Sequence, residues 1–258
     1  MLILCYGMAK SGSTLTFELV KGMLESTGHT QIRLPDGVVN AGHIVNFAEP
    51  IDRERVDALI DAVGQRWIAV KTHAGFRPLF FPRLEELQLD GKLRIIASYR
   101  DPRDLCLSLL DAGEQARKRG EQTFSPITGM DVAIKHADDH IEKFRRWASV
   151  RGTLRLDYET VAFSPDIAID EIERHLGIAC DRDAAKRHAF EGAFTQQNKM
   201  KSRRFETDLT DAEKARLTEA FNVFIREVCE TQDDGYFTSH RDEILRRAER
   251  AARKHSRT

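Results

Sequence analysis

Four short apolar runs divide the chain into segments. They cover residues 2–6, 67–70, 93–99 and 153–156, and the first three are followed by glycine or by polar residues. A continuous apolar run of this length is typical of a strand that is buried on both faces of a parallel sheet. The pattern therefore predicts four buried strands, of which the fourth carries the fewest apolar residues.

Between these runs, apolar residues recur at spacings of three and four, which is the period of an amphipathic helix. The helical patterns begin at Thr14 and cover 53–64, 105–110 and 132–150. Strands that alternate with helices favour a parallel sheet with helices on both faces. We therefore predict a single α/β domain that binds its ligands at the carboxyl ends of the strands.

The last third of the chain is predicted to be helical and charged. One helical segment extends over 164–177, and a second runs from Thr210 to about Cys229. Thr210 and Glu213 have the spacing of a capping box, in which each side chain accepts a hydrogen bond from the other residue's backbone amide. This pair marks the start of the second helix.

The residues from Arg241 onward form a basic tail, with seven basic and three acidic side chains and a net charge of 7 − 3 = +4. We expect a solvated helix that frays, and a partner-binding or anion-steering tail is the alternative. No repeat or low-complexity linker interrupts the preceding chain. The sequence thus predicts one domain over residues 1–240 and a basic helical tail over 241–258.

Composition narrows the classes of function. The 258 residues are 41% hydrophobic and 31% charged, as in an ordinary globular domain. The 40 basic and 41 acidic residues give a formal net charge of −1, so we expect no nucleic-acid partner and no general attraction to acidic membranes. An anion site must therefore be built from local groups.

Cysteines and apolar segments bear on the location of the protein. No apolar run approaches the ~20 residues of a membrane span, and the first six residues lack the features of a signal peptide. None of the four cysteines has a partner at a metal-ligand spacing; they are Cys5, Cys106, Cys180 and Cys229. We interpret them as reduced structural thiols and expect a cytoplasmic protein.

The segment between the first strand and the first helix has the composition of a phosphate cradle. Gly12 permits a positive φ and a close approach of the backbone to a ligand. Amides at a helix N-terminus attract an anion, and Lys10 adds a positive charge. Hydroxyl donors are added by Ser11, Ser13 and Thr14. The loop is P-loop-like but differs from the loop of nucleoside triphosphate enzymes, which has a Lys directly after its last Gly.

A second group of polar residues follows the third strand. Arg100 stands at the strand end, where a guanidinium can make two contacts to a phosphate. Asp101 and Pro102 are typical of the start of a helix, and Ser108 lies two helical turns further on. From these residues alone, an Arg–Asp pair that only stabilises the strand–helix junction is the alternative.

These two segments together resemble the cofactor motifs of sulfotransferases that use 3′-phosphoadenosine 5′-phosphosulfate (PAPS). Residues 10–14, Lys-Ser-Gly-Ser-Thr, are similar to the family's 5′-phosphosulfate loop, Lys-Ser-Gly-Thr-Thr. The family holds the 3′-phosphate with an Arg and a Ser eight residues later, joined by Arg-Asn/Asp-Pro-x-Asp, as in residues 100–108. The resemblance implies PAPS as co-substrate, 3′-phosphoadenosine 5′-phosphate (PAP) as product, and no metal.

The same resemblance implies roles for single residues. Lys10 would contact the bridging oxygen of the leaving phosphate, with Ser11 to Thr14 around the 5′-phosphate, and Arg100 with Ser108 would hold the 3′-phosphate. The second strand ends in Lys71-Thr72-His73, a sequence that in the cytosolic-type enzymes contains the general base. His73 would then remove the acceptor proton during in-line attack on sulfur, and Lys71 would stabilise the transferring group.

From the residues alone, an ordinary core or loop histidine is the better interpretation of His73. His43 and His136 are rival bases that rank lower, because neither ends a predicted strand. The match is looser elsewhere. Three further cofactor-binding candidates follow from it: Tyr158 toward adenine, and Lys199 or Lys201 in place of an Arg-Lys-Gly motif whose Gly is absent. The Trp that stacks on adenine in the family is replaced here by Leu15.

Two stretches, residues 29–50 and 111–130, are predicted to shape an acceptor pocket, the second as a long insertion that acts as a mobile lid. The acceptor would be a small molecule or glycan with a hydroxyl, or an amine; carbohydrate, phenol, lipid and peptide all remain open, as does the oligomeric state. The alternatives are a kinase-like nucleotide enzyme and a non-catalytic protein that binds PAPS or PAP. The lack of a carboxylate cluster for Mg²⁺ argues against the first, and the combination of Lys10, Lys71 and His73 against the second.

Overall fold

The computed structural model describes residues 1–42, 44–192 and 201–255. In this part of the chain, four parallel strands form one sheet in the order β2-β1-β3-β4. The strands are β1 (Leu2–Gly7), β2 (Ile68–Thr72), β3 (Leu93–Tyr99) and β4 (Leu154–Asp157). All four predicted strands and the α/β class are thereby confirmed.

Strand β1 lies between β2 and β3, and both of its faces are apolar. Leu2, Leu4 and Tyr6 pack into the larger core on one face of the sheet. Ile3 and Cys5 pack into a second core on the opposite face. The alternation along one strand therefore supplies both hydrophobic cores, as a continuous apolar run predicts.

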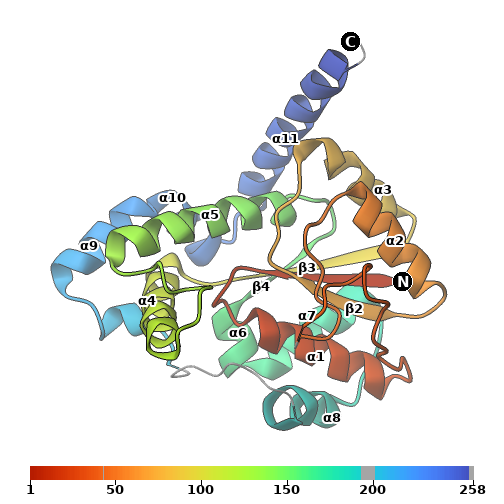
Figure 1. The fold of residues 1–258 in the computed structure, drawn as a ribbon, viewed down its shortest axis with the longest axis horizontal. Coiled ribbons are helices and arrows are strands. Elements are labelled where there is room, and N and C mark those ends of the chain that lie inside the picture. The colour runs from red at the N-terminus through yellow and green to blue at the C-terminus, as the bar shows by residue number, and fades with distance from the viewer. Residues whose placement is uncertain (43, 193–200, 256–258) are drawn as a thin grey trace.

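Helices cover both faces (Figure 1). The smaller core lies under α1 (Ser13–Ser26), α6 (Tyr158–Phe163), α7 (Pro165–Leu176) and α8 (Arg182–Arg187). The larger core lies under α2 (Arg53–Val63), α3 (Phe81–Leu89), α4 (Pro102–Arg119) and α5 (Met130–Ala148), together with the C-terminal helices. Helix α3 was not predicted, and neither was the short α8.

The predicted insertion at 111–130 is largely wrong. Helix α4 continues to Arg119, so only the residues between α4 and α5 form a loop. This loop folds back on α4: Arg117 Nη1 donates to the Ser125 and Ile127 carbonyls at 3.0 and 2.7 Å. Gly113 permits the contact, because a Cβ there would lie 2.3 Å from the Ile127 oxygen. The charged side chains of this stretch belong to an exposed helical face.

The C-terminal helices begin as predicted and then diverge. Thr210 and Glu213 form the expected capping box at the start of α9 (Asp211–Ala220). The helix does not continue to Cys229 but breaks at Phe221, and α10 (Asn222–Phe224) and a π-helical turn (Ile225–Glu230) follow. Phe221 and Phe224, on either side of the break, are both buried in the larger core.

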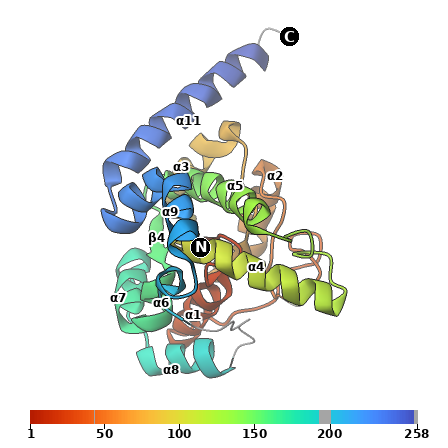
Figure 2. The same cartoon turned by 90° about the vertical axis from the view of Figure 1, so that its left-hand side faces the viewer.

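The last helix, α11 (Asp234–His255), begins before the predicted tail and projects from the body of the molecule (Figures 1 and 2). Its first half packs against the turn at 78–80, α3 and α5. None of the helices in the described ranges is both long and apolar enough to cross a lipid bilayer.

Candidate active site

The four strands end at one edge of the sheet, which gathers their polar extensions. Tyr6 pairs with Thr72, Gly7 with Ser98, and Tyr99 with Asp157, so the strand ends are in register. Because the strands are parallel, the loop after β1, His73 after β2, Arg100 after β3 and Tyr158 after β4 emerge side by side. This is the edge at which the sequence predicts ligand binding.

The loop between β1 and α1 is shaped by its own backbone. Gly12 has φ 72°, and Lys10 also has a positive φ of 71°. Ser11 is buried and donates its hydroxyl to the Met8 carbonyl at 2.8 Å, so its side chain holds the loop together. Ser13 opens α1, whose first amides have no partner within the helix and point toward the strand ends.

Lys71 joins β2 to this loop. Its side chain is 1% exposed, and Nζ donates to Thr14 Oγ1 at 2.6 Å. Burial lowers the pKa of Lys71 to about 8, a shift that the carboxylates of Glu18 and Glu49 oppose. The ammonium is therefore still mostly protonated at neutral pH, and it lies beside the N-terminus of α1.

His73 is held in one tautomer by the loop. Its Nδ1 lies 2.6 Å from the Gly7 carbonyl oxygen, which can only accept, so Nδ1 carries the proton and Nε2 carries the lone pair. Its backbone amide donates to Glu49 Oε1 at 2.9 Å. Burial, and next the Lys71 cation, lower the pKa of His73 to about 3. The ring is thus a neutral base at physiological pH.

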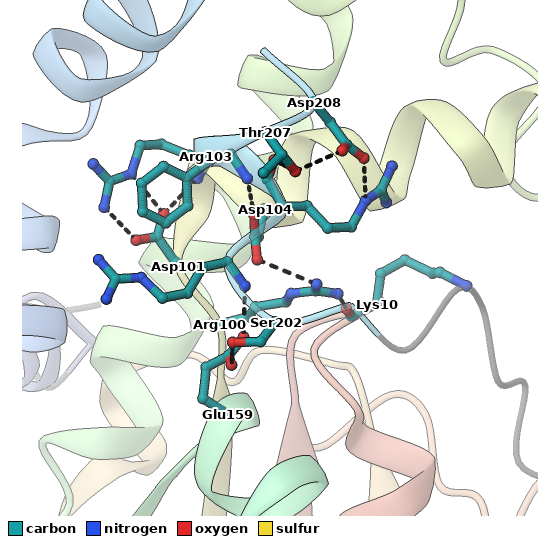
Figure 3. Close-up of polar contacts among 12 residues, drawn as sticks. Lys10, Arg100, Asp101, Arg103, Asp104, Glu159, Ser202, Thr207 and Asp208 are labelled. Atoms are coloured by element: carbon teal, nitrogen blue, oxygen red, sulfur yellow. Dashed lines mark hydrogen bonds and ion pairs between the residues drawn. The ribbon is translucent and has the colours of Figure 1, made fainter.

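Arg100 is buried at the end of β3 with only 6% of its surface exposed (Figure 3). Its Nη2 lies 3.3 Å from Asp104 Oδ2, but its buried Nε has no hydrogen-bond partner among the residues that the structure describes. Burial, and next the charge of Arg100, lower the pKa of Lys10, so these two cations lie close enough to repel each other. Ser108 is buried further along α4. The site holds unused donors that suit an anion.

Tyr158 closes the side of the site nearest β4. The Arg100 guanidinium carbon lies 4.1 Å from the centre of the Tyr158 ring. The ring also lies against Gly12, where an added Cβ would lie 2.7 Å from Tyr158 Cδ2. Asp157 caps α6 by accepting from the Glu159 and Thr160 amides, which fixes the backbone at Tyr158. The tyrosine therefore lies against both segments that the sequence predicts to bind phosphate.

The comparison with known proteins agrees with this arrangement. The family model described as the sulfotransferase domain matches residues 2–243. The chain belongs to the sulfotransferase family. A search of curated proteins returned no match.

Two solved structures resemble this sulfotransferase in fold. One is retinol dehydratase in complex with androsterone and the inactive cofactor PAP, at 16% identity and a TM-score of 0.51, over 90% of this chain and 81% of that one. The other is the mouse sulfotransferase SULT7A1 complexed with PAP, at 17% identity and a TM-score of 0.55, over 88% and 85% of the two chains. At these identities the likeness shows a common fold.

Some predicted residues of this sulfotransferase lie apart from the site or outside the description. Lys199 and His43 fall outside the described residues. Lys201 is exposed and its Nζ lies 3.3 Å from Asp208 Oδ1. His136 is exposed on α5. His73 is therefore the one predicted base that the described residues bring to the strand ends.

The stretch 29–50 does reach the site of this sulfotransferase. The Ala48 amide donates to the Lys71 carbonyl and the Lys71 amide donates to the Asn46 carbonyl, both at 2.9 Å, so Phe47 forms an isolated parallel bridge with Lys71 at the edge of β2. The Phe47 ring centre lies 5.7 Å from that of His73. The stretch therefore contacts both Lys71 and His73, and its role in an acceptor pocket stays a prediction.

Glu49 and Asp104 were missed as functional candidates. Glu49 carries no signal in the sequence, because its contact with His73 depends on how the 29–50 stretch crosses β2. Asp104 is the last residue of the Arg-Asp-Pro-x-Asp motif, but the resemblance to that motif implied no role for it.

Proposed function

We propose that this sulfotransferase moves the sulfuryl group of PAPS to a hydroxyl or amine of a small-molecule or glycan acceptor. The observation that carries the proposal is the bond between His73 Nδ1 and the Gly7 carbonyl, which holds a neutral base at the end of β1, where the proposed phosphate-binding loop begins. A base and an anion cradle at one sheet edge are what in-line group transfer requires.

The reaction uses groups that the site already contains. His73 Nε2 takes the proton of the acceptor O–H while the acceptor oxygen forms a bond to sulfur. The bond between sulfur and the 5′-phosphate oxygen breaks, and PAP leaves with the electron pair. Lys10, Lys71 and the first amides of α1 meet the negative charge that develops on the leaving phosphate and the transferred group.

The opposite end of the donor is assigned to Arg100, Ser108 and Tyr158. The buried Nε of Arg100 without a partner supports a 3′-phosphate at this position, because an unpaired buried donor is costly until a ligand accepts from it. Tyr158 offers a ring next to Gly12 for adenine. Lys201 is also a candidate to bind the 3′-phosphate, but its ion pair with Asp208 would first have to break.

Thermal unfolding with PAP, with ATP and with neither, all in EDTA, tests the proposal. A ligand at a hundred times its Kd stabilises the fold by about 2.7 kcal/mol, which raises Tm on the order of 5 °C for a domain of this size. We expect this shift with PAP alone. No shift with PAP, together with a shift from Mg²⁺-ATP in a parallel run without chelator, would replace the proposal with the kinase alternative.

Transfer itself is measured with sulfur-labelled PAPS and a panel of acceptors that includes a sterol alcohol, a phenol and a sugar. We expect labelled product from the wild-type protein, and a loss of 10²- to 10⁴-fold on His73→Ala. PAP binding without labelled product from any acceptor class would favour the non-catalytic alternative.

A further inference from the structure

Asp104 lies at the centre of a polar cluster for which the proposed reaction has no role (Figure 3). Its side chain is 1% exposed. One carboxylate oxygen, Oδ2, lies 3.3 Å from Arg100 Nη2, and the other, Oδ1, accepts from the Phe205 amide at 2.8 Å. A single buried carboxylate therefore connects the end of β3 to a segment 101 positions later in the chain.

That segment, residues 201–208, is fastened to α4 by further contacts. Arg204 is 4% exposed; its Nη1 lies 2.8 Å from Asp111 Oδ2 and its Nε lies 3.0 Å from Asp208 Oδ2. The Arg103 guanidinium lies 3.7 Å from the centre of the Phe205 ring. Because Arg204 is already held by two carboxylates, we assign it to anchoring the segment and not to binding an anion.

The 201–208 segment also reaches α6. Ser202 Oγ donates to Glu159 Oε2, and the Arg203 amide lies within hydrogen-bond distance of the same carboxylate. Glu159 directly follows Tyr158, on whose ring Arg100 stacks. The segment thus bridges the two elements that hold the Arg100–Tyr158 pair from either side.

We propose that Asp104 is a positioning residue for the donor, which orients the Arg100 guanidinium toward the 3′-phosphate and makes this orientation depend on the 201–208 segment. The inference rests on the proposed function. With Nη2 held by Asp104 and the plane stacked on Tyr158, the guanidinium keeps its buried Nε free for a ligand. Binding then costs less ordering of a long side chain.

Asp104 also has an opposing effect, because its negative charge repels an anion. Removing that charge would strengthen phosphate binding by Coulomb attraction and weaken it through the lost orientation. The sign of the measured change therefore distinguishes a positioning carboxylate from one that merely screens Arg100.

The test compares PAP with adenosine 5′-monophosphate, which lacks the 3′-phosphate, by calorimetric titration. We expect the wild-type protein to prefer PAP, and Asp104→Asn to reduce the ratio of the two affinities by about tenfold while its affinity for adenosine 5′-monophosphate changes less than about twofold. Glu114→Gln is the matched control on the same helix, since Glu114 is exposed and pairs with Lys118 at 2.6 Å. It should leave both affinities unchanged.

A second variant tests the proposal if Asp104→Asn does not fold. Arg204→Lys keeps the Asp104–Arg100 pair but cannot reach both Asp111 and Asp208, so we expect it to reduce the affinity ratio about threefold. An unchanged or higher ratio in a folded Asp104→Asn protein, or an equal loss for both nucleotides, overturns the positioning role and leaves the proposed function intact. A wild-type protein without any preference for PAP overturns both.

Discussion

At the scale of single residues, His73 shows how two contacts decide a protonation state. Its Nδ1 is bonded to Gly7, and burial with the nearby Lys71 cation lowers its pKa to about 3. A histidine in the unfolded chain has a pKa near ~6.5. As the pH falls below that value, the unfolded state takes up a proton that the folded state does not, so the folded state loses stability.

This linkage predicts a loss of about 2 kcal/mol in the free energy of unfolding between pH 7.5 and pH 5.0 from His73 alone. His73→Asn places an amide N–H at the position of Nδ1 for the Gly7 carbonyl but does not titrate. The free energy of unfolding of this variant should therefore fall by about 2 kcal/mol less than that of the wild-type protein over this pH interval. Denaturant unfolding of both proteins at the two pH values measures the difference, and the other buried histidines cancel. The same pH dependence in both proteins would mean that His73 has an ordinary pKa.

At the scale of elements, the turn from β1 into α1 depends on Gly12. An alanine there would have to adopt φ 72° and would press its Cβ to 2.7 Å from the Tyr158 ring. Gly120 at the end of α4 is a matched control, because it has φ 69° but no atom within 4 Å of an added Cβ. The two glycines share the backbone strain, and only Gly12 has the steric contact.

We expect Gly120→Ala to cost about 1 kcal/mol and Gly12→Ala about 2–3 kcal/mol in the free energy of unfolding. Because the displaced Tyr158 also contacts Arg100, PAP affinity should fall at least about tenfold in Gly12→Ala and stay unchanged in Gly120→Ala. Thermal unfolding with and without PAP measures both quantities. Equal behaviour of the two variants would show that the contact between the loop and Tyr158 has no part in donor binding.

At the scale of the whole molecule, α11 connects the C-terminus to the body. Phe237, Ile244 and Ala248 are buried, and Arg241 donates to both oxygens of Glu85 at 2.6 and 2.7 Å. The boundary at 240/241 that the sequence suggests therefore falls inside one helix, between buried residues. The sequence did not predict that this helix packs on the body, because its basic residues are many and its apolar positions are few and widely spaced.

A chain that ends after His240 should lose about 2–4 kcal/mol of stability, since it loses the burial of Ile244 and the pair between Arg241 and Glu85. Its Tm should fall on the order of 5 °C, while a chain that ends after Arg250 should change by less than about 2 °C. Calorimetry on both truncated chains measures this. Equal stability in the two would make 241–258 an independent tail, as its charge pattern suggests.

The strands and the turn after β1 could be predicted because their signals are local. An apolar run such as residues 2–6 reports burial on both faces, and Gly12 ahead of a helical pattern reports a backbone with positive φ at a helix start. The breaks were harder to predict. The helix breaks at Phe221, although its own residues favour continuation and Phe221 and Phe224 have the spacing of one helix face, so no local signal marks the break.

The α/β class, the four strands and the glycine turn into α1 could be predicted from the sequence, because periodicity and glycine act over a few positions. Which groups meet was visible only in the folded chain: His73 with Gly7, Lys71 with Thr14, and Asp104 with both Arg100 and Phe205. These contacts join residues far apart in the chain. Their protonation and orientation follow from burial, which exists only once the segments have packed together.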